Sequence, residues 1–243
     1  MPSLLFLGAT SDIAIETARI FGEKHFDIYM AGRDIEYLNK LKKDFEIRYN
    51  ISANIIHFDA LNFTEHRHFI DSLIPFPDVT ICAFGYLGDQ QRAQLDWSEA
   101  KLILETNFSG AVSILNEVAN LYERQKRGTI VGITSVAGDR GRQSNYLYGS
   151  AKAGFSTYLS GLRQRLYPSG VNVISIKPGF VRTKMTEHLE LPRFLTADPK
   201  QVAKKIEAGI SKQANIIYVK AIWRYVMLII KLIPENIFKR TRL

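Results

Sequence analysis

The sequence predicts an α/β protein whose doubly wound parallel sheet forms a single domain. Short apolar runs alternate with helical stretches along the chain, and a glycine turn follows the first run. The chain has 243 residues, of which 46% are hydrophobic and 23% charged, which is enough to build a sizeable core. This alternation favours parallel strands joined by right-handed crossovers, with helices on both faces of the sheet. We therefore expect a Rossmann-like fold.

Each element follows from its local pattern. Strands buried on both faces are expected where the apolar runs are short, at residues 4–7, 27–31, 53–58, 79–84, 129–134, 172–177 and 216–219. Amphipathic stretches between them predict helices at residues 12–24, 35–49, 64–73, 97–126, 146–167 and 199–212. Thr64 is the expected N-cap of the third helix. The composition changes only near residue 221, where a basic and apolar tail begins.

The positive charge is concentrated in that tail. The net charge is +8, and the segment from residue 220 onward carries +5 of it. A nearly neutral body argues against a nucleic-acid partner. The basic residues of the tail, set against the single acid Glu235, are Lys220, Arg224, Lys231, Lys239, Arg240 and Arg242.

The cysteine and histidine content excludes several chemistries. The single cysteine, Cys82, rules out a disulfide framework and a cysteine-based metal centre. The five histidines follow no metal-ligand spacing, and His66 and His68 are expected to be solvated at a helix start. No metal site is expected. The chain opens without a basic segment and cleavage site of the secretory type, which together with an unpaired cysteine favours a cytoplasmic protein.

The turn after the first strand is a candidate phosphate site. A glycine here lets the backbone approach a phosphate, and the following helix N-terminus supplies free N–H donors. Only one of the three glycines of a dinucleotide-binding turn is present, so a plain strand–helix turn is the alternative. The residues concerned are Gly8, Thr10, Ser11, Asp12 and Ile13.

The ends of the second and third strands carry charged candidates. Arg33 follows the second strand, where an arginine pairs with the 2′-phosphate of NADP and an acid would bind the ribose of NAD. NADP(H) is therefore favoured, with NAD(H) as the alternative if Asp34 turns inward. A surface arginine that closes a turn is the other interpretation of Arg33. Asp59 is placed either to accept from an adenine amino group or to cap the next turn.

The pair Tyr148 and Lys152 carries the catalytic hypothesis. Spacing of four residues puts the phenol and the ammonium on one helix face, where a cation is expected to lower the tyrosine pKa. Such a tyrosine exchanges a proton with a carbonyl oxygen. Ser135 lies at the same strand edge, and Asn107 interrupts a segment of good helix formers. On its own, a tyrosine and a lysine at this spacing often occur together by chance on solvated helices, so a purely structural pair is the alternative.

Together, these residues resemble the short-chain dehydrogenase/reductase family over about residues 3–220. Residues 8–14 resemble its cofactor turn, and residues 178–183 resemble its Pro-Gly…Thr loop, which contacts the nicotinamide amide. The family's catalytic tetrad falls on Asn107, Ser135, Tyr148 and Lys152. Cofactor contacts are implied at the turn residues above and at Arg33, Asp59, Ala60, Ala83, Phe84, Gly85, Tyr148, Lys152, Pro178, Gly179, Val181 and Thr183.

The sequence departs from the family pattern at two places. Asp12 and Ala14 stand where glycines are usual, and Cys82-Ala83-Phe84-Gly85 replaces Asn-Asn-Ala-Gly. These segments, residues 83–90 and the tail resemble a keto-reductase branch acting on a 2-keto sugar attached to a polyprenyl phosphate. On the family's pattern, residues 1–220 form a dinucleotide-binding catalytic domain and residues 221–243 an amphipathic basic tail.

The resemblance implies reduction of a carbonyl to a secondary alcohol by NAD(P)H. Tyr148 would protonate the carbonyl oxygen, and Lys152 would lower the Tyr148 pKa and hold the nicotinamide ribose. Ser135 would bind the carbonyl oxygen, and Asn107 would hold a water in the proton relay. The alternatives are a soluble ketone or 3-oxoacyl reductase and a non-catalytic dinucleotide-binding regulatory protein. A homo-dimer or homo-tetramer is expected.

The tail has two interpretations. A helix from about Ala221 to Pro234 would be too short and too charged to span a bilayer, but it resembles an interfacial helix with basic flanks. In that interpretation Trp223, Ile229 and Ile230 enter a membrane surface, and the protein lies peripherally at the inner face of the membrane. A contact with another subunit, or with the domain itself, is the alternative.

Overall fold

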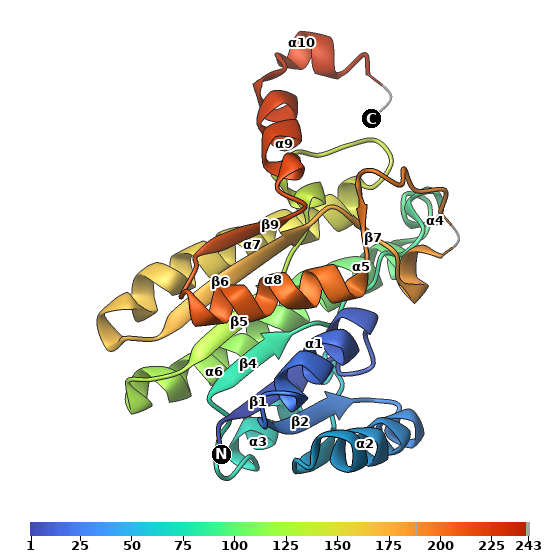
Figure 1. Ribbon diagram of the computed structural model, residues 1–243. Helices are drawn as coiled ribbons and strands as arrows, with labels where there is room; N and C mark the ends of the chain where they lie inside the picture. Colours follow the sequence, from blue (N-terminus) through green and yellow to red (C-terminus); the bar gives the residue numbers. More distant parts are fainter. Residues whose placement is uncertain (188, 242–243) are drawn as a thin grey trace.

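A parallel sheet forms the centre of the protein (Figure 1), which is described here from a computed structural model covering residues 1–187 and 189–241. Its seven strands lie in the order β3-β2-β1-β4-β5-β6-β9, and every neighbouring pair is parallel. The order reverses between β1 and β4, where ligands bind in folds of this class. The strands are β1 Ser3–Leu7, β2 Asp27–Gly32, β3 Ala53–His57, β4 Val79–Cys82, β5 Thr129–Ile133, β6 Asn172–Pro178 and β9 Ile216–Val219.

Helices cover both faces of this sheet, as Figure 1 shows. On one face lie α1 Asp12–Gly22, α2 Ile35–Tyr49 and α8 Pro199–Ser211. On the other lie α3 His66–Asp71, α6 Gly110–Gln125 and α7 Tyr146–Leu166. The remaining helices are α4 Gln90–Ala93, α5 Trp97–Leu104, α9 Ile222–Leu232 and α10 Glu235–Phe238, with short 3-10 turns at η1 Phe63–Glu65, η3 Val136–Asp139, η4 Tyr167–Ser169 and η5 Lys184–Thr186.

The first strand shows why the sheet is buried on both sides. Leu4 and Phe6 enter the core beneath α1, α2 and α8, whereas Leu5 and Leu7 enter the core beneath α3, α6 and α7. All four side chains are fully buried. A strand with apolar residues at consecutive positions therefore needs a helical layer on each face. The expected doubly wound α/β fold is confirmed.

The helix expected at residues 97–126 is interrupted. Between α5 and α6 the chain forms a π-helical segment, η2 Glu105–Ser109. Within this segment the Asn107 Nδ2 donates to the Ile103 carbonyl at 2.8 Å. That carbonyl lies four residues earlier, where the Asn107 backbone N–H would donate in an α-helix. A continuous α-helix was the wrong prediction for this stretch.

The segment expected as a helix at residues 64–73 also differs. It consists of η1 and α3, and Thr64 lies inside η1 rather than at a helix N-cap. His66, expected to be solvated, is buried on the face of α3 that carries Phe69 and Ile70. Its Nδ1 contacts Ser113 Oγ at 2.8 Å, and burial lowers its pKa. His68 is exposed, as expected.

Two small elements escaped the sequence patterns. A two-stranded ladder, β7 Phe180–Val181 with β8 Thr196–Ala197, frames the loop after β6. The short helix α4 follows the loop after β4. Elements of two to four residues are too short to show a hydrophobic period.

The tail helix forms where it was expected. α9 ends just before Pro234, which cannot continue a helix. Arg140, in the loop before α7, donates through Nη1 to the carbonyls of Ile230 at 2.5 Å and Ile233 at 2.6 Å. These carbonyls lie at the C-terminal end of α9, so the contact fixes α9 to the body. No helix in the described ranges is long and apolar enough to cross a membrane.

The tail helix turns a different face inward from the one expected. Trp223 was expected at a membrane surface, but it is buried against the domain with Met227. The exposed apolar face instead carries Tyr225, Leu228, Ile229 and Leu232. Two of the tail residues, Arg242 and Leu243, lie outside the described residues, as does His188.

Candidate active site

A cavity of about 590 Å³ opens at the carboxyl edge of the sheet. It is lined by the segments that follow β1 to β6 and by Trp223 of α9. Ser135, Tyr148 and Lys152 line it, together with the residues for which cofactor contacts were expected: Gly8, Thr10, Ser11, Asp12, Ile13, Arg33, Asp59, Ala60, Ala83, Phe84, Gly85, Pro178, Gly179, Val181 and Thr183. Asn107 is the expected site residue that does not line it.

The turn after β1 brings the Gly8 backbone close to Phe84, which follows β4. Gly8 has φ +84°, and a Cβ there would lie 2.7 Å from the backbone nitrogen of Phe84. Only glycine fits a position with both properties. Ser11 caps α1, since its Oγ accepts from the Ala14 N–H at 3.2 Å. The turn therefore presents a helix N-terminus to the cavity, which suits a phosphate group.

Asp12, which stands where the family has a glycine, has a structural partner. Its Oδ2 accepts from the backbone N–H of Lys184 at 2.8 Å. Lys184 begins η5, beyond the loop after β6. The carboxylate thus joins the turn after β1 to the opposite wall of the cavity.

The end of β2 leaves one cation facing the cavity. The Arg33 guanidinium is exposed and makes no hydrogen bond or ion pair within the described residues. Asp34 does not turn inward, because its Oδ1 accepts from the Tyr37 N–H at 2.9 Å and caps α2. Asp59 caps a turn by accepting from the Leu61 N–H at 3.0 Å, and it also lines the cavity. Asp59 therefore caps the turn, and its contact with an adenine amino group stays a prediction.

Asn107 supports the cavity from behind. Its Nδ2 donates to the carbonyls of Tyr86 at 2.6 Å and Ile103 at 2.8 Å, and its Oδ1 accepts from the Tyr86 N–H at 3.2 Å. Both amide N–H groups are used, so only an Oδ1 lone pair is left for a water. A Cβ at Gly85 would lie 2.9 Å from that Oδ1, which explains a glycine there.

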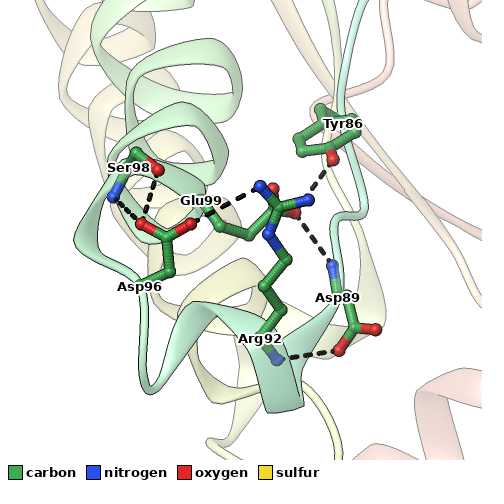
Figure 2. Close-up of polar contacts among 6 residues, drawn as sticks. All are labelled: Tyr86, Asp89, Arg92, Asp96, Ser98 and Glu99. Carbon is green, nitrogen blue, oxygen red and sulfur yellow. Dashed lines mark hydrogen bonds and ion pairs between the residues drawn. The ribbon is translucent and has the colours of Figure 1, made fainter.

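A polar network holds the same segment from the other side (Figure 2). Glu99 is buried, and its Oε1 accepts from the Tyr86 hydroxyl at 2.8 Å and from the Asp89 N–H at 3.1 Å. Asp89 in turn caps α4 by accepting from the Arg92 N–H at 3.0 Å. Residues 86–89, which directly follow the segment that replaces Asn-Asn-Ala-Gly, are therefore held by Asn107 at Tyr86 and by Glu99 at Tyr86 and Asp89.

Three of the four tetrad positions meet in the cavity. The Ser135 Oγ accepts from the Ala137 N–H at 3.1 Å, which orients the hydroxyl at the end of β5. Lys152 is buried, and its Nζ donates to the Ile133 carbonyl at 3.1 Å. The same Nζ lies 5.7 Å from the centre of the Tyr148 ring. The cavity therefore brings a hydroxyl, a phenol and an ammonium group together.

The expected effect of Lys152 on Tyr148 is not found in the unliganded protein. Withdrawal from water raises the pKa of Tyr148 to about 12, although hydrogen bonding to Ser135 acts in the opposite direction. Burial also lowers the pKa of Lys152 to about 8. The prediction of a lowered tyrosine pKa was wrong, because desolvation outweighs the hydrogen bond with Ser135 and the Lys152 ammonium is directed to the Ile133 carbonyl.

The tail contributes a wall that sequence reasoning missed. Trp223 packs against the loop after β6, and its Nε1 donates to the Leu195 carbonyl at 3.0 Å. A Cβ at Gly179 would overlap the indole.

Two polar residues before α7, Arg142 and Asn145, also line the cavity and were missed. Their position between Ser135 and Tyr148 was the available signal.

No metal site accompanies this cavity in the described ranges, since no group of three or more His, Cys, Asp and Glu side chains is placed to hold an ion. Cys82 is buried beneath the site, and burial raises the pKa of its thiol to about 12.

Comparison with known proteins identifies the family. Residues 3–193 match the short chain dehydrogenase family. An uncharacterized oxidoreductase of Mycobacterium tuberculosis is 31% identical over 242 residues, covering 98% of this chain and 96% of the relative. One of Streptomyces coelicolor is 32% identical over 241 residues, covering 98% and 95%. The chain belongs to the short-chain dehydrogenase family, whose members are NAD(P)-dependent oxidoreductases.

Solved structures share the fold at low sequence identity. A short-chain dehydrogenase from Sphingobium yanoikuyae in complex with NADPH superposes with a TM-score of 0.83 at 19% identity, covering 94% of this chain and 92% of that chain. A variant of actinorhodin polyketide ketoreductase with NADPH gives 0.80 at 22% identity, covering 90% and 95%.

Proposed function

We propose that this protein reduces a carbonyl to a secondary alcohol with NADPH. The observation that carries the proposal is the meeting of Ser135, Tyr148 and Lys152 in one cavity with the turn at Gly8 and the loop at Gly179. Ser135 follows β5, Tyr148 and Lys152 lie on α7, and the two glycines follow β1 and β6, so their convergence is a property of the fold. A non-catalytic binding protein would have no need of the complete set.

The chain's own residues divide the chemistry among them. Tyr148, protonated at neutral pH because its pKa is raised, donates a proton to the carbonyl oxygen. Ser135 hydrogen-bonds the same oxygen and orients the carbonyl. Lys152 binds the nicotinamide ribose hydroxyls, and Asn107 positions the Tyr86 segment behind them. The nicotinamide, when bound, supplies the hydride.

NADP(H) is the preferred cofactor in this proposal. Arg33 has an unpaired guanidinium at the end of β2, whereas the Asp34 carboxylate is engaged in capping α2. An unpaired guanidinium favours a 2′-phosphate, and the absence of a carboxylate directed at the ribose disfavours NAD(H). Two solved structures with the same fold, the Sphingobium yanoikuyae dehydrogenase and the actinorhodin ketoreductase variant, contain NADPH, which supports this choice.

For the substrate we propose a 2-keto sugar attached to a polyprenyl phosphate. The support is the resemblance of residues 8–13, residues 83–90 and the tail to the keto-reductase subunit of decaprenylphosphoryl-ribose 2-epimerase. The similarity to full-length oxidoreductases of Mycobacterium and Streptomyces extends through the tail. The competing candidate is a soluble ketone or 3-oxoacyl reductase, a class suggested by the polyketide ketoreductase with the same fold.

A lipid-linked substrate suits the outer face of α9, which we propose binds an anionic membrane surface. Leu228, Ile229 and Leu232 are 55%, 65% and 72% exposed. Basic side chains at Arg224 and Lys231 are exposed on the same helix. Apolar side chains flanked by cations are complementary to anionic headgroups above acyl chains. A subunit contact within the expected homo-dimer or homo-tetramer is the competing role for this face.

Oxidation of NADPH with a panel of carbonyl compounds tests the function. The panel pairs a 2-keto sugar on a short polyprenyl phosphate with a soluble ketone and a 3-oxoacyl thioester. We expect the highest kcat/KM for the lipid-linked keto sugar. A higher value for the thioester supports the competing candidate, and tight NADPH binding without turnover of any carbonyl supports a non-catalytic protein. Native mass spectrometry in parallel reports retained cofactor, lipid and the oligomeric state.

A further inference from the structure

Unpaired polar atoms gather at the start of α7. Among the described residues, the buried side-chain polar atoms without a hydrogen-bond partner are Gln90 Nε2, Arg142 Nε, Asn145 Oδ1 and Asn172 Nδ2. The first three lie together, because Gln90 Oε1 accepts from the Leu147 N–H at 3.0 Å and the Asn145 N–H donates to the Arg142 carbonyl at 3.1 Å. Buried polar atoms are normally paired, so such a cluster points to a polar ligand.

Two members of this cluster face the reaction site. Arg142 and Asn145 line the same cavity as Ser135 and Tyr148. Both lie in the turn that leads into α7, whose first turn carries Tyr148. A ligand group held by this turn would therefore lie beside the carbonyl that Tyr148 protonates.

Arg142 brings a positive charge that the protein does not neutralise. Its guanidinium makes no hydrogen bond or ion pair within the described residues. The acid that acts on it, Asp139, is committed elsewhere, because its carboxylate accepts from Lys177 Nζ at 2.5 Å and from the Tyr218 hydroxyl at 2.8 Å. Burial lowers the pKa of Arg142, yet an arginine stays charged at neutral pH. A half-buried and unpaired guanidinium is a site for an oxyanion.

The 2′-phosphate of NADP is not the anion that fits here. Arg33 follows β2 and Arg142 follows β5, and the strand order places β1 and β4 between these two strands. Three strand spacings of about 4.8 Å separate β2 from β5 by about 14 Å. The two arginines thus serve opposite ends of the cavity, one toward the cofactor and the other toward the substrate.

We propose that Arg142, with Asn145, binds a phosphate group that the substrate carries next to its reacting carbonyl. This inference rests on the proposed reductase function and specifies the substrate class. Arg142 donates to the phosphate oxygens, whereas Asn145 Oδ1 accepts from a neighbouring hydroxyl. A carboxylate on the substrate would accept the same hydrogen bonds from Arg142, and the experiment below distinguishes a carboxylate from a phosphate.

Three substrates with the same hydroxyketone core test the inference: dihydroxyacetone, which is neutral, hydroxypyruvate, which carries a carboxylate, and dihydroxyacetone phosphate. We expect the wild type to have the highest kcat/KM with the phosphate. Arg142→Gln should lower the kcat/KM for dihydroxyacetone phosphate by about 10- to 100-fold, as expected for a lost charge-assisted hydrogen bond. The kcat/KM for dihydroxyacetone should be unchanged. Arg142→Lys keeps the positive charge but loses the planar guanidinium. Its kcat/KM for dihydroxyacetone phosphate should therefore lie between those of the wild type and Arg142→Gln.

A binding measurement keeps the test independent of turnover. Calorimetry of dihydroxyacetone phosphate binding to the protein saturated with NADP⁺ fills the cofactor site first and forms a complex that cannot react. Arg142→Gln should raise this Kd by the same factor. Arg124→Gln is the control, because it removes an exposed charge in the last turn of α6 and should change neither quantity.

Several outcomes overturn the inference. If Arg142→Gln leaves both kcat/KM and Kd for the phosphate unchanged while dihydroxyacetone is reduced, Arg142 binds no substrate anion and the reductase function stands. A selective loss with hydroxypyruvate assigns a carboxylate instead. An equal loss with all three substrates, accompanied by a lower Tm, makes Arg142 structural. If the wild type reduces none of them and no carbonyl of the panel above, but binds the phosphate through Arg142, the proposed reductase function fails and the anion site stands.

Discussion

The indole of Trp223 lies against Gly179 so closely that a Cβ at Gly179 would overlap it. Trp223 belongs to the tail helix α9, and Gly179 to the loop that the family uses to contact the nicotinamide. The indole also packs edge-on against Phe180, with ring centres 5.3 Å apart. Since α9 is held at its other end by Arg140, the tail is part of the cavity wall.

Gly179→Ala should therefore disturb both stability and cofactor binding. Overpacking costs about 1–3 kcal/mol, so we expect the free energy of unfolding in urea to fall by that amount. The KM for NADPH should rise as the loop is displaced. Gly161→Ala is the control: nothing lies within 4 Å of a Cβ there, and alanine in a helix should add about 0.5–1 kcal/mol of stability. Wild-type stability of Gly179→Ala would contradict the close contact.

Tyr148→Phe should abolish turnover and preserve NADPH affinity. The substitution removes the hydroxyl that donates the proton, for which the expected loss in kcat is about 10²–10⁴-fold. Lys152 and the Gly8 turn, which hold the cofactor, are unchanged. Tyr146→Phe removes an exposed hydroxyl from the same helix and should behave as the wild type. A Tyr148→Phe enzyme that keeps more than about a tenth of the rate would show that another group donates the proton.

Lys152→Met should change how the stability of the unliganded protein depends on pH. The folded-state pKa of Lys152 is about 8, below its unfolded value, so between these values only the unfolded wild type binds the extra proton. Wild-type stability relative to Lys152→Met should therefore rise with pH above 8, by at most about 1.4 kcal/mol per pH unit. Urea unfolding across this range measures it. A difference that is constant with pH would mean that Lys152 titrates as an ordinary lysine.

Arg33→Ala should remove the preference for NADPH. Loss of a charge-assisted contact with the 2′-phosphate should raise the Kd for NADPH by about 10- to 100-fold and leave the Kd for NADH unchanged. Asp34→Asn preserves the cap of α2 and should retain the preference. Equal wild-type affinities for the two cofactors, unaffected by Arg33→Ala, would reject the assignment.

Leu228→Ser combined with Leu232→Ser should abolish co-sedimentation with anionic vesicles. Both side chains are exposed on α9, so folding and reduction of a soluble ketone should be preserved. Ile47→Ser, which removes an 85% exposed aliphatic side chain from α2, is the matched control. Point variants are preferable to deletion after Val219, because deletion also removes Trp223 from the cavity. If the wild type ignores vesicles at low salt and the double variant changes oligomeric state, this face is a subunit contact.

The sequence by itself determined the sheet and the edge at which the cavity opens. Leu4–Leu7 could be identified as a strand buried on both faces, and Gly8, Arg33 and Ser135 could be placed at strand ends, because these depend on local patterns. Parallel strands bring their carboxyl ends to one edge of the sheet, regardless of the conformation of the connecting loops. Tyr148 and Lys152 share a helix face through their spacing alone.

Only the tertiary structure decided the contacts between residues distant in the chain. Trp223 entered the cavity wall because α9 folds back onto Gly179, and His66 was buried because α3 packs beneath α6. The hydrogen bonds between Asn107 and Tyr86 join residues 21 positions apart in the chain. The Tyr148 pKa is raised because burial, which no spacing rule reports, outweighs the hydrogen bond with Ser135. Such effects depend on packing and solvent exclusion, and these exist only once the elements are assembled.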